Sequence, residues 1–153
     1  MPKRFRFGLE TLLHHRQRIE DERAGGLARA VQARLEAEAA VRAIDERTER
    51  SLADQAALLA QGGFAAPDLA AFVNFRHGLE VQREHAQKTV AKALHEEERA
   101  RRALVQARQD REALSRLKDK QFKAWQIEID NAEAHLMDEL ATQAFARPAR
   151  PET

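Results

Sequence analysis

The strongest interruption in the sequence is the stretch QGGFAAPD, at residues 61–68. Paired glycines can end a helix, and a proline followed by an aspartate can begin the next one. Long runs of strong helix formers lie on both sides, and the chain has only 6 Gly and 4 Pro to make other reversals. We therefore predict a helix from about residue 8 to 60, a turn over 61–67, and a second helix from about 68 to 145.

The composition agrees with long helices rather than a globule. Charged residues make up 33% of the chain and aromatic residues only 5%, a balance typical of coiled coils. Disorder is the competing interpretation, but 43% of the residues are hydrophobic and they recur periodically. The expected fold class is all-α: a long antiparallel two-helix coiled-coil hairpin with an overhanging C-terminal helix end. It forms one domain over residues 1–153, with a frayed tail over 147–153.

The second predicted helix has the clearer apolar stripe. Many of its members are Ala, which allows two helices to approach closely, and after Leu114 the stripe shifts onto Phe122, Trp125 and Ile129. In alternating steps of four and three residues, the first part of the stripe passes through eleven positions, eight of them apolar: Leu79, Arg83, Ala86, Val90, Ala93, Glu97, Ala100, Leu104, Ala107, Arg111 and Leu114.

The first predicted helix has a weaker stripe in two parts. The second part is one residue out of phase with the first, and the change of phase falls at Gly25-Gly26. Each glycine costs about 1 kcal/mol relative to Ala inside a helix, so this point is either soft or a true break. The first part is Leu9, Leu12, Arg16 and Ile19, and the second is Leu27, Ala30, Arg34, Ala37, Val41 and Ile44.

A short turn makes the two helices antiparallel neighbours, and it pairs residues whose numbers add up to about 128. Phe5 then lies near Lys123, and residues beyond about Asn131 have no partner. An overhang of about 15–20 residues spans roughly 25–30 Å of helix. An uncovered apolar band of this kind usually marks a partner site. The band contains Ile127, Ile129, Leu136, Met137 and Leu140.

The opening aromatics belong to the same end of the predicted hairpin. Phe5 and Phe7 are expected to pack onto Phe122 and Trp125. Their basic neighbours have two interpretations: solvated flanks of a simple hydrophobic cap, or contacts for an acidic surface. These neighbours are Lys3, Arg4 and Arg6.

No pattern of catalytic or metal-binding residues is present in the sequence. The chain has no Cys, no HExxH motif, no His pair spaced i, i+4 and no Gly-rich phosphate loop. We therefore expect no enzyme activity, no catalytic residue, no cofactor and no metal. The basic stretch from Arg99 to Lys123 has three interpretations: a salt-bridged solvated face, a surface for an acidic protein groove, or a nucleic-acid site.

Three motifs together resemble the FliJ family of flagellar export proteins across nearly the whole chain. FRFGLETLLHHR, at residues 5–16, has two aromatics followed by paired leucines. DLAAFVNFRHGLE, at 68–80, has an aromatic-x-x-aromatic-x-x-x-Leu-Glu pattern. LSRLKDKQFKAWQIEIDNAEAHLMDELATQAF, at 114–145, ends in a Met-Asp-Glu-Leu-Ala run. The order and spacing of the three make the resemblance more specific than any one motif.

The resemblance implies a non-enzymatic coiled-coil hairpin similar to part of a rotary-ATPase central stalk. It implies three partners: the flagellar export ATPase hexamer, the cytoplasmic domain of the export gate, and export chaperones. Nucleic acid is not among them. The implied location is the cytoplasm, peripheral at the inner face of the membrane through these partners only. The alternatives are the stalk of a virulence type III secretion system, or a nucleic-acid-binding or tethering coiled coil.

The resemblance also implies two sets of partner-binding residues. Position 72 is often Tyr or Trp in the family, so a Phe there retains only the packing role. The export-gate set is Phe72, Phe75 and Leu79. With the residues of the predicted cap and overhang, the ATPase-ring set is Phe5, Phe7, Gln121, Trp125, Ile129, Leu136, Met137, Asp138, Glu139 and Leu140.

Overall fold

The computed structural model describes residues 3–148, and these form two long helices and no strand. Helix α1 spans Glu10–Ala60 and helix α2 spans Ala66–Ala146. The two helices pack against each other as an all-α helical hairpin, which is the predicted fold class. Of the predicted tail, residues 149–153 lie outside the described part of the chain.

The turn between the helices uses glycine and aspartate as the sequence suggests. Gly62 has a φ of 75°, a left-handed conformation that a residue with a side chain rarely adopts, and its N–H donates to the Leu59 carbonyl at 3.2 Å. At the start of α2, the carboxylate of Asp68 accepts a hydrogen bond from the Ala65 N–H at 3.1 Å. The Asp68 N–H in turn donates to the Ala65 carbonyl at 3.0 Å, and α2 begins at Ala66, before the proline.

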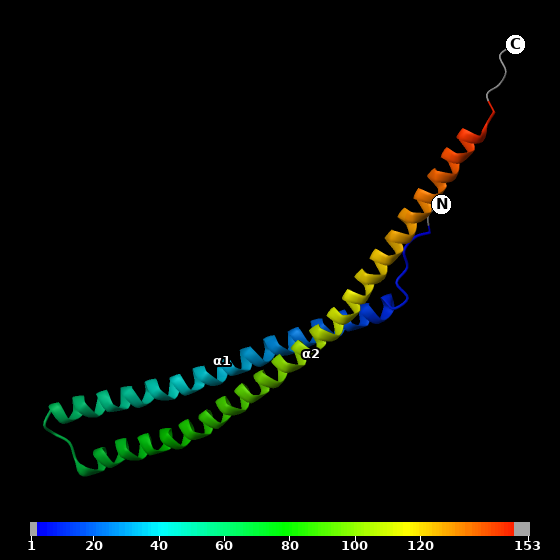
Figure 1. Ribbon diagram of the computed structural model, residues 1–153. Helices are drawn as coiled ribbons and strands as arrows, with labels where there is room; N and C mark the ends of the chain where they lie inside the picture. The colour runs from blue at the N-terminus through cyan, green and yellow to red at the C-terminus, as the bar shows by residue number, and fades with distance from the viewer. Residues whose placement is uncertain (1–2, 149–153) are drawn as a thin grey trace. The chain divides into compact units, whose positions relative to one another are not determined.

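The described chain divides into two compact units, each with a part of both helices. The terminal unit contains residues 3–19 and 108–148, and the turn unit contains residues 20–107. Within the turn unit, α1 and α2 run antiparallel from the turn (Figure 1, cyan to green).

Ion pairs between the helices confirm the predicted pairing of residues in both units. In the turn unit, Arg83 donates to Asp45 at 2.7 Å. In the terminal unit, Lys118 lies 2.9 Å from Glu10. Each pair joins residues whose numbers add up to 128, as a short antiparallel connection requires.

The predicted stripe on α2 is confirmed from Leu79 to Leu114, whereas Phe122, onto which it was expected to continue, is 41% exposed. None of its eleven members between Leu79 and Leu114 is exposed, and Leu79, Glu97 and Ala107 are buried. Successive members follow one another by three or four positions, the spacing of a helix–helix seam within each unit.

The structure corrects two members of the first part of the stripe on α1, while Arg16 and Ile19 are half-buried as expected. Leu13 is only 4% exposed, whereas the predicted Leu9 and Leu12 are 40% and 39% exposed. Counted from Leu13, a seven-residue repeat leads directly to Leu27, which is also turned inward. The apparent change of phase came from assigning the wrong leucine of the pair.

Gly25 and Gly26 therefore interrupt neither the stripe nor the helix. Both are helical and half-buried within α1. A Cβ added at Gly25 would meet the Arg29 guanidinium at 3.5 Å, which is an ordinary van der Waals contact. No close approach of another backbone requires a glycine at either position.

Candidate partner-binding surfaces

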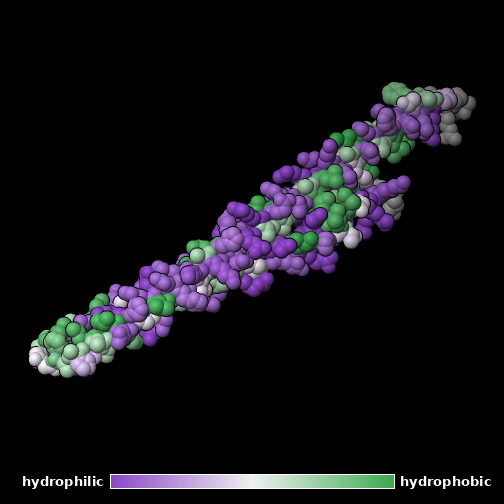
Figure 2. Space-filling view, turned by 90° about the horizontal axis from the view of Figure 1, so that it is seen from below, coloured by the Kyte–Doolittle hydropathy of each residue, from purple (hydrophilic) through white to green (hydrophobic). Residues whose placement is uncertain are grey.

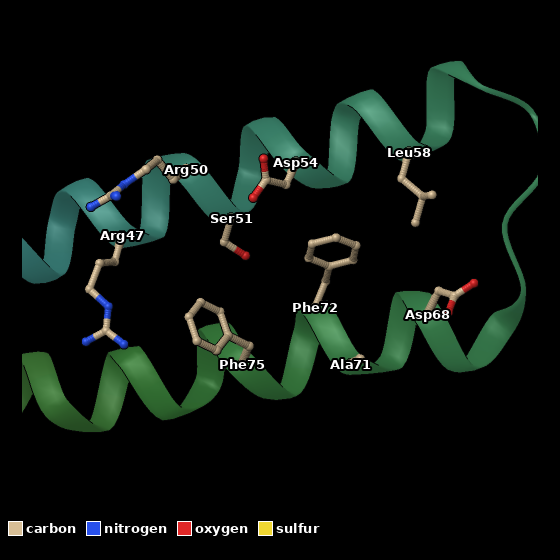
Figure 3. A pocket seen from close by; sticks show the side chains of 9 residues that line it. All are labelled: Arg47, Arg50, Ser51, Asp54, Leu58, Asp68, Ala71, Phe72 and Phe75. Carbon is tan, nitrogen blue, oxygen red and sulfur yellow. The ribbon is translucent and has the colours of Figure 1, made fainter.

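A groove of about 700 Å³ lies between the helices of the turn unit, beside the turn. We call it the turn groove. Figure 3 shows its lining side chains, and hydrophobic surface also gathers around the turn at the lower left of Figure 2. The lining residues are Arg47, Arg50, Ser51, Asp54 and Leu58 of α1, with Asp68, Ala71, Phe72 and Phe75 of α2.

The three residues assigned to the export gate have different surroundings. Phe75 is 47% exposed and Phe72 is half-buried, and both rings form one wall of the turn groove. Leu79 is 2% exposed, the largest fully buried side chain in the described chain. Phe72 and Phe75 therefore have surface for a partner, whereas Leu79 belongs to the seam that holds their helix in place.

Two arginines lie at one end of the turn groove. The guanidinium of Arg47 is 5.9 Å from the centre of the Phe75 ring, a cation–π distance. Neither Arg47 nor Arg50 forms an ion pair with a residue in 3–148, and both are exposed. Their charges are therefore free to meet an acidic group of another molecule.

The hydroxyl of Ser51 lies at the bottom of the turn groove. Ser51 is 4% exposed, and its Oγ has no hydrogen-bond partner within the described chain. In Figure 3 the Oγ points between the helices, toward the space between Phe72 and Phe75. A buried hydroxyl without a partner is costly, so this position is unusual in a seam.

In the terminal unit, an aromatic cluster packs the non-helical segment before α1 against α2. The Phe5 ring meets Phe122 edge-on with centroids 5.3 Å apart, and it lies 5.8 Å from Trp125. Phe122 and Trp125 are 5.6 Å apart, and Phe7 is only 7% exposed. The structure confirms the predicted packing of Phe5, whereas Phe7 is buried without a ring contact to Phe122 or Trp125 in residues 3–148. Aromatic pairs at these separations stabilise the contact beyond their buried area.

The last part of α2 exposes an apolar surface, which we call the terminal band. Ile129 is half-buried, but every residue from Asp130 to Pro148 is exposed. Gln121, Asp138 and Glu139, the polar members of the predicted ATPase-ring set, are exposed as well. The band contains Ile127 (60% exposed), Leu136 (56%), Met137 (69%), Leu140 (52%) and Phe145 (93%).

A charged network stabilises the middle of the seam. Glu97 is only 8% exposed, and it accepts hydrogen bonds from Arg34 of α1 and, at 3.0 Å, from Arg101 of α2. Hydrogen bonds from Arg34, first to Glu97 and then to Glu38, raise the pKa of its guanidinium above the ordinary value. The network holds the two helices in register. Its charged groups are paired with one another, so none is available as a catalytic group.

Local ion pairs favour the solvated-face interpretation of the basic stretch between Arg99 and Lys123. Arg102 lies 3.0 Å from Glu98, Arg116 lies 3.6 Å from Glu112, and Lys118 lies 2.9 Å from Glu10. Each of these acids is within a helical turn or directly across the seam. Charge neutralised in this way is not a dense stripe for a polyanion.

Neither a metal centre nor a membrane-spanning segment is found in residues 3–148. No three His, Asp or Glu side chains of this part come together around a possible ion. Within the same residues, no helix combines the length and the apolar character that crossing a bilayer requires.

Neither the α1 side of the turn groove nor the most exposed residue of the terminal band was predicted from the sequence. Arg47, Arg50 and Ser51 carry no motif, and they matter only because α2 places two aromatic rings opposite them. Phe145 could have been predicted, since the antiparallel pairing leaves the helix beyond about Asn131 without a partner helix, and Phe145 is 93% exposed.

A family model described as the flagellar FliJ protein matches residues 5–150. The match covers the opening aromatics, both helices and the turn, so it includes both candidate surfaces. No curated protein and no solved structure gave a significant match to the chain.

Proposed function

Since the chain belongs to the FliJ family and is thus a flagellar export-related protein, we propose that it is a non-enzymatic, stalk-like component of the flagellar type III export apparatus. In this proposal the terminal unit enters the ring of the export ATPase. The turn unit contacts the cytoplasmic domain of the export gate, and the protein also assists export chaperones. It acts in the cytoplasm, at the inner face of the membrane, through these partners.

The terminal band is the observation that carries the ATPase contact. It is a length of helix whose apolar side chains no part of residues 3–148 covers. Large exposed apolar patches of this kind usually mark interaction sites. Between Ala124 and Ala146 the chain has five acidic residues and no Lys or Arg, so a basic lining of the ring would complement it.

Binding to the purified export ATPase hexamer tests the ATPase contact. We expect the full-length chain to bind the hexamer and to change its rate of ATP hydrolysis. We expect the chain alone to hydrolyse no ATP. A hexamer that neither binds the chain nor changes its rate would overturn the stalk role.

The turn groove supports the gate contact. Phe72 and Phe75 present aromatic surface there, while Leu79 acts indirectly by packing their helix against α1. Exposed aromatic side chains beside arginines have the composition typical of protein-binding hot spots.

A virulence-type stalk and a nucleic-acid-binding hairpin are the alternatives. The matched family model is the flagellar one, which favours the flagellar system. The local pairing of the basic stretch disfavours nucleic acid. Retention on a DNA or RNA column that falls steeply with salt would support the nucleic-acid alternative.

A further inference from the structure

We propose that the turn groove binds a short segment of the export gate in which one acidic side chain lies beside an apolar one. The inference rests on the gate contact proposed above, and it assigns the chemistry of the partner's segment. Three features support it: two unpaired arginines, an unpaired hydroxyl and two aromatic rings. All of them line one groove of about 700 Å³.

The positive charge of two arginines favours an acidic partner group at one end of the groove. Arg47 and Arg50 both line that end, and neither has an ion-pair partner in the described chain. Two unpaired guanidinium groups on neighbouring turns offer a carboxylate several donors at once.

The Ser51 hydroxyl is the second observation. A hydroxyl inside a helix either points to solvent or donates to the carbonyl four residues earlier. Thr48, Thr89 and Thr142 do so, at 3.1, 3.2 and 2.8 Å. Ser51 does not, although it is 96% buried, and its Oγ points into the groove instead. A donor left unpaired at the bottom of a groove is satisfied when a partner supplies an acceptor.

The remaining lining limits the partner to a single acid. Phe72 and Phe75 form an apolar wall, which accepts an aliphatic or aromatic side chain. Toward the turn, Asp54 and Asp68 line the groove and would repel a second carboxylate. The bound segment therefore places its acid near Arg47 and Arg50 and its apolar residue against the rings.

Calorimetric titration of the full-length chain with the purified cytoplasmic domain of the export gate tests the inference. We expect Arg50→Glu to weaken binding by about tenfold or more, because it replaces an attractive charge with a repulsive one. The matched control is Arg42→Glu, which makes the same charge change on an exposed part of α1 outside the groove. The control should bind as the unchanged chain does.

Ser51→Ala separates a binding role from a structural one. Removing the unpaired hydroxyl should leave the melting temperature unchanged or higher, yet weaken gate binding by roughly fivefold. A lower melting temperature would mean that the hydroxyl is bonded inside the hairpin, which overturns its role in binding.

Two other outcomes are distinguishable. If the unchanged chain binds the gate domain and Arg50→Glu and Ser51→Ala bind equally well, the groove chemistry is wrong while the gate contact stands. If the unchanged chain does not bind the gate domain, the gate contact fails and the inference fails with it.

Discussion

At the scale of single residues, Phe75 and Leu79 illustrate how one helical turn separates two roles. Leu79 is enclosed by the seam at 2% exposure, whereas Phe75 is 47% exposed under the guanidinium of Arg47. Their spacing of four residues would place both on one face of an isolated helix. The partner helix covers one and leaves the other open.

Truncation of Leu79 should therefore lower mainly stability, and truncation of Phe75 should weaken mainly binding. We expect Leu79→Ala to lower the free energy of unfolding by about 2–4 kcal/mol, because a buried Leu leaves a cavity. Phe75→Ala should change stability by less than about 1 kcal/mol, yet weaken gate binding by roughly tenfold. Urea denaturation followed by circular dichroism and calorimetric titration measure the two effects. Equal destabilisation by both variants would contradict the assignment.

At the scale of the helices, α1 is continuous through its paired glycines and α2 is continuous to Ala146. The seam between them contains many Ala and charged side chains, so ordinary hydrophobic burial contributes less than in a Leu-rich coiled coil. Register then depends on particular polar contacts such as those of Glu97.

Glycine substitutions test the continuity of α1. Gly25→Ala and Gly26→Ala should each raise the free energy of unfolding by about 0.5–1 kcal/mol, because the helix already exists there and has room for a methyl group. Gly62→Ala is the contrasting variant. Its φ of 75° disfavours a side chain, so it should lower stability by about 1 kcal/mol. Thermal melting of the three variants checks the sign of each change.

Removing Glu97 tests whether its polar contacts hold the two helices in register. In the Glu97→Ala variant, Arg34 loses its partner across the seam and Arg101 loses its neighbour. We expect the melting temperature to fall by roughly 4 °C or more. Glu98→Ala removes an exposed pair with Arg102 and should lower it by less than about 1 °C. Similar losses in the two variants would show that the seam does not depend on Glu97.

At the scale of the whole molecule, each unit has one candidate partner-binding surface, and the two surfaces differ in character. The turn groove is a lined hollow with charge at one end, while the terminal band is a bare helix face. The first suits a short segment of a partner. The second needs a partner that surrounds it, because its apolar residues are distributed along several turns.

Ending the chain after Asn131 tests the separation of folding from binding. All described residues beyond that point are exposed, so the melting temperature should stay within about 2 °C of the full-length value. Binding to the ATPase hexamer should weaken at least tenfold, since the apolar anchors are gone. Trp125 is the only Trp in the chain, so its fluorescence reports directly on this unit. Unchanged affinity would exclude the terminal band from the contact.

Much of the fold could be predicted because the signals are local. The turn at Gly62 and Asp68, the stripe from Leu79 to Ala107 and the contact of Phe5 with Trp125 all follow from turn chemistry, periodicity and the antiparallel pairing. The choice between Leu12 and Leu13 could not be made in this way. Leu12 continues the spacing from Leu9 to Ile19 and Leu13 continues the spacing that contains Leu27, and only packing selects between the two.

The sequence by itself determined two helices, where they reverse and which long stripe joins them, since helix propensity and spacing act along the chain. Only the tertiary structure decided that Phe75 stays open, that Ser51 is buried without a hydrogen-bond partner, and that two unpaired arginines flank them. These properties arise where residues from different helices meet. Where two helices meet, the burial, hydrogen bonding and ion pairing of a residue depend on the side chains of the facing helix. A local sequence pattern does not contain that information.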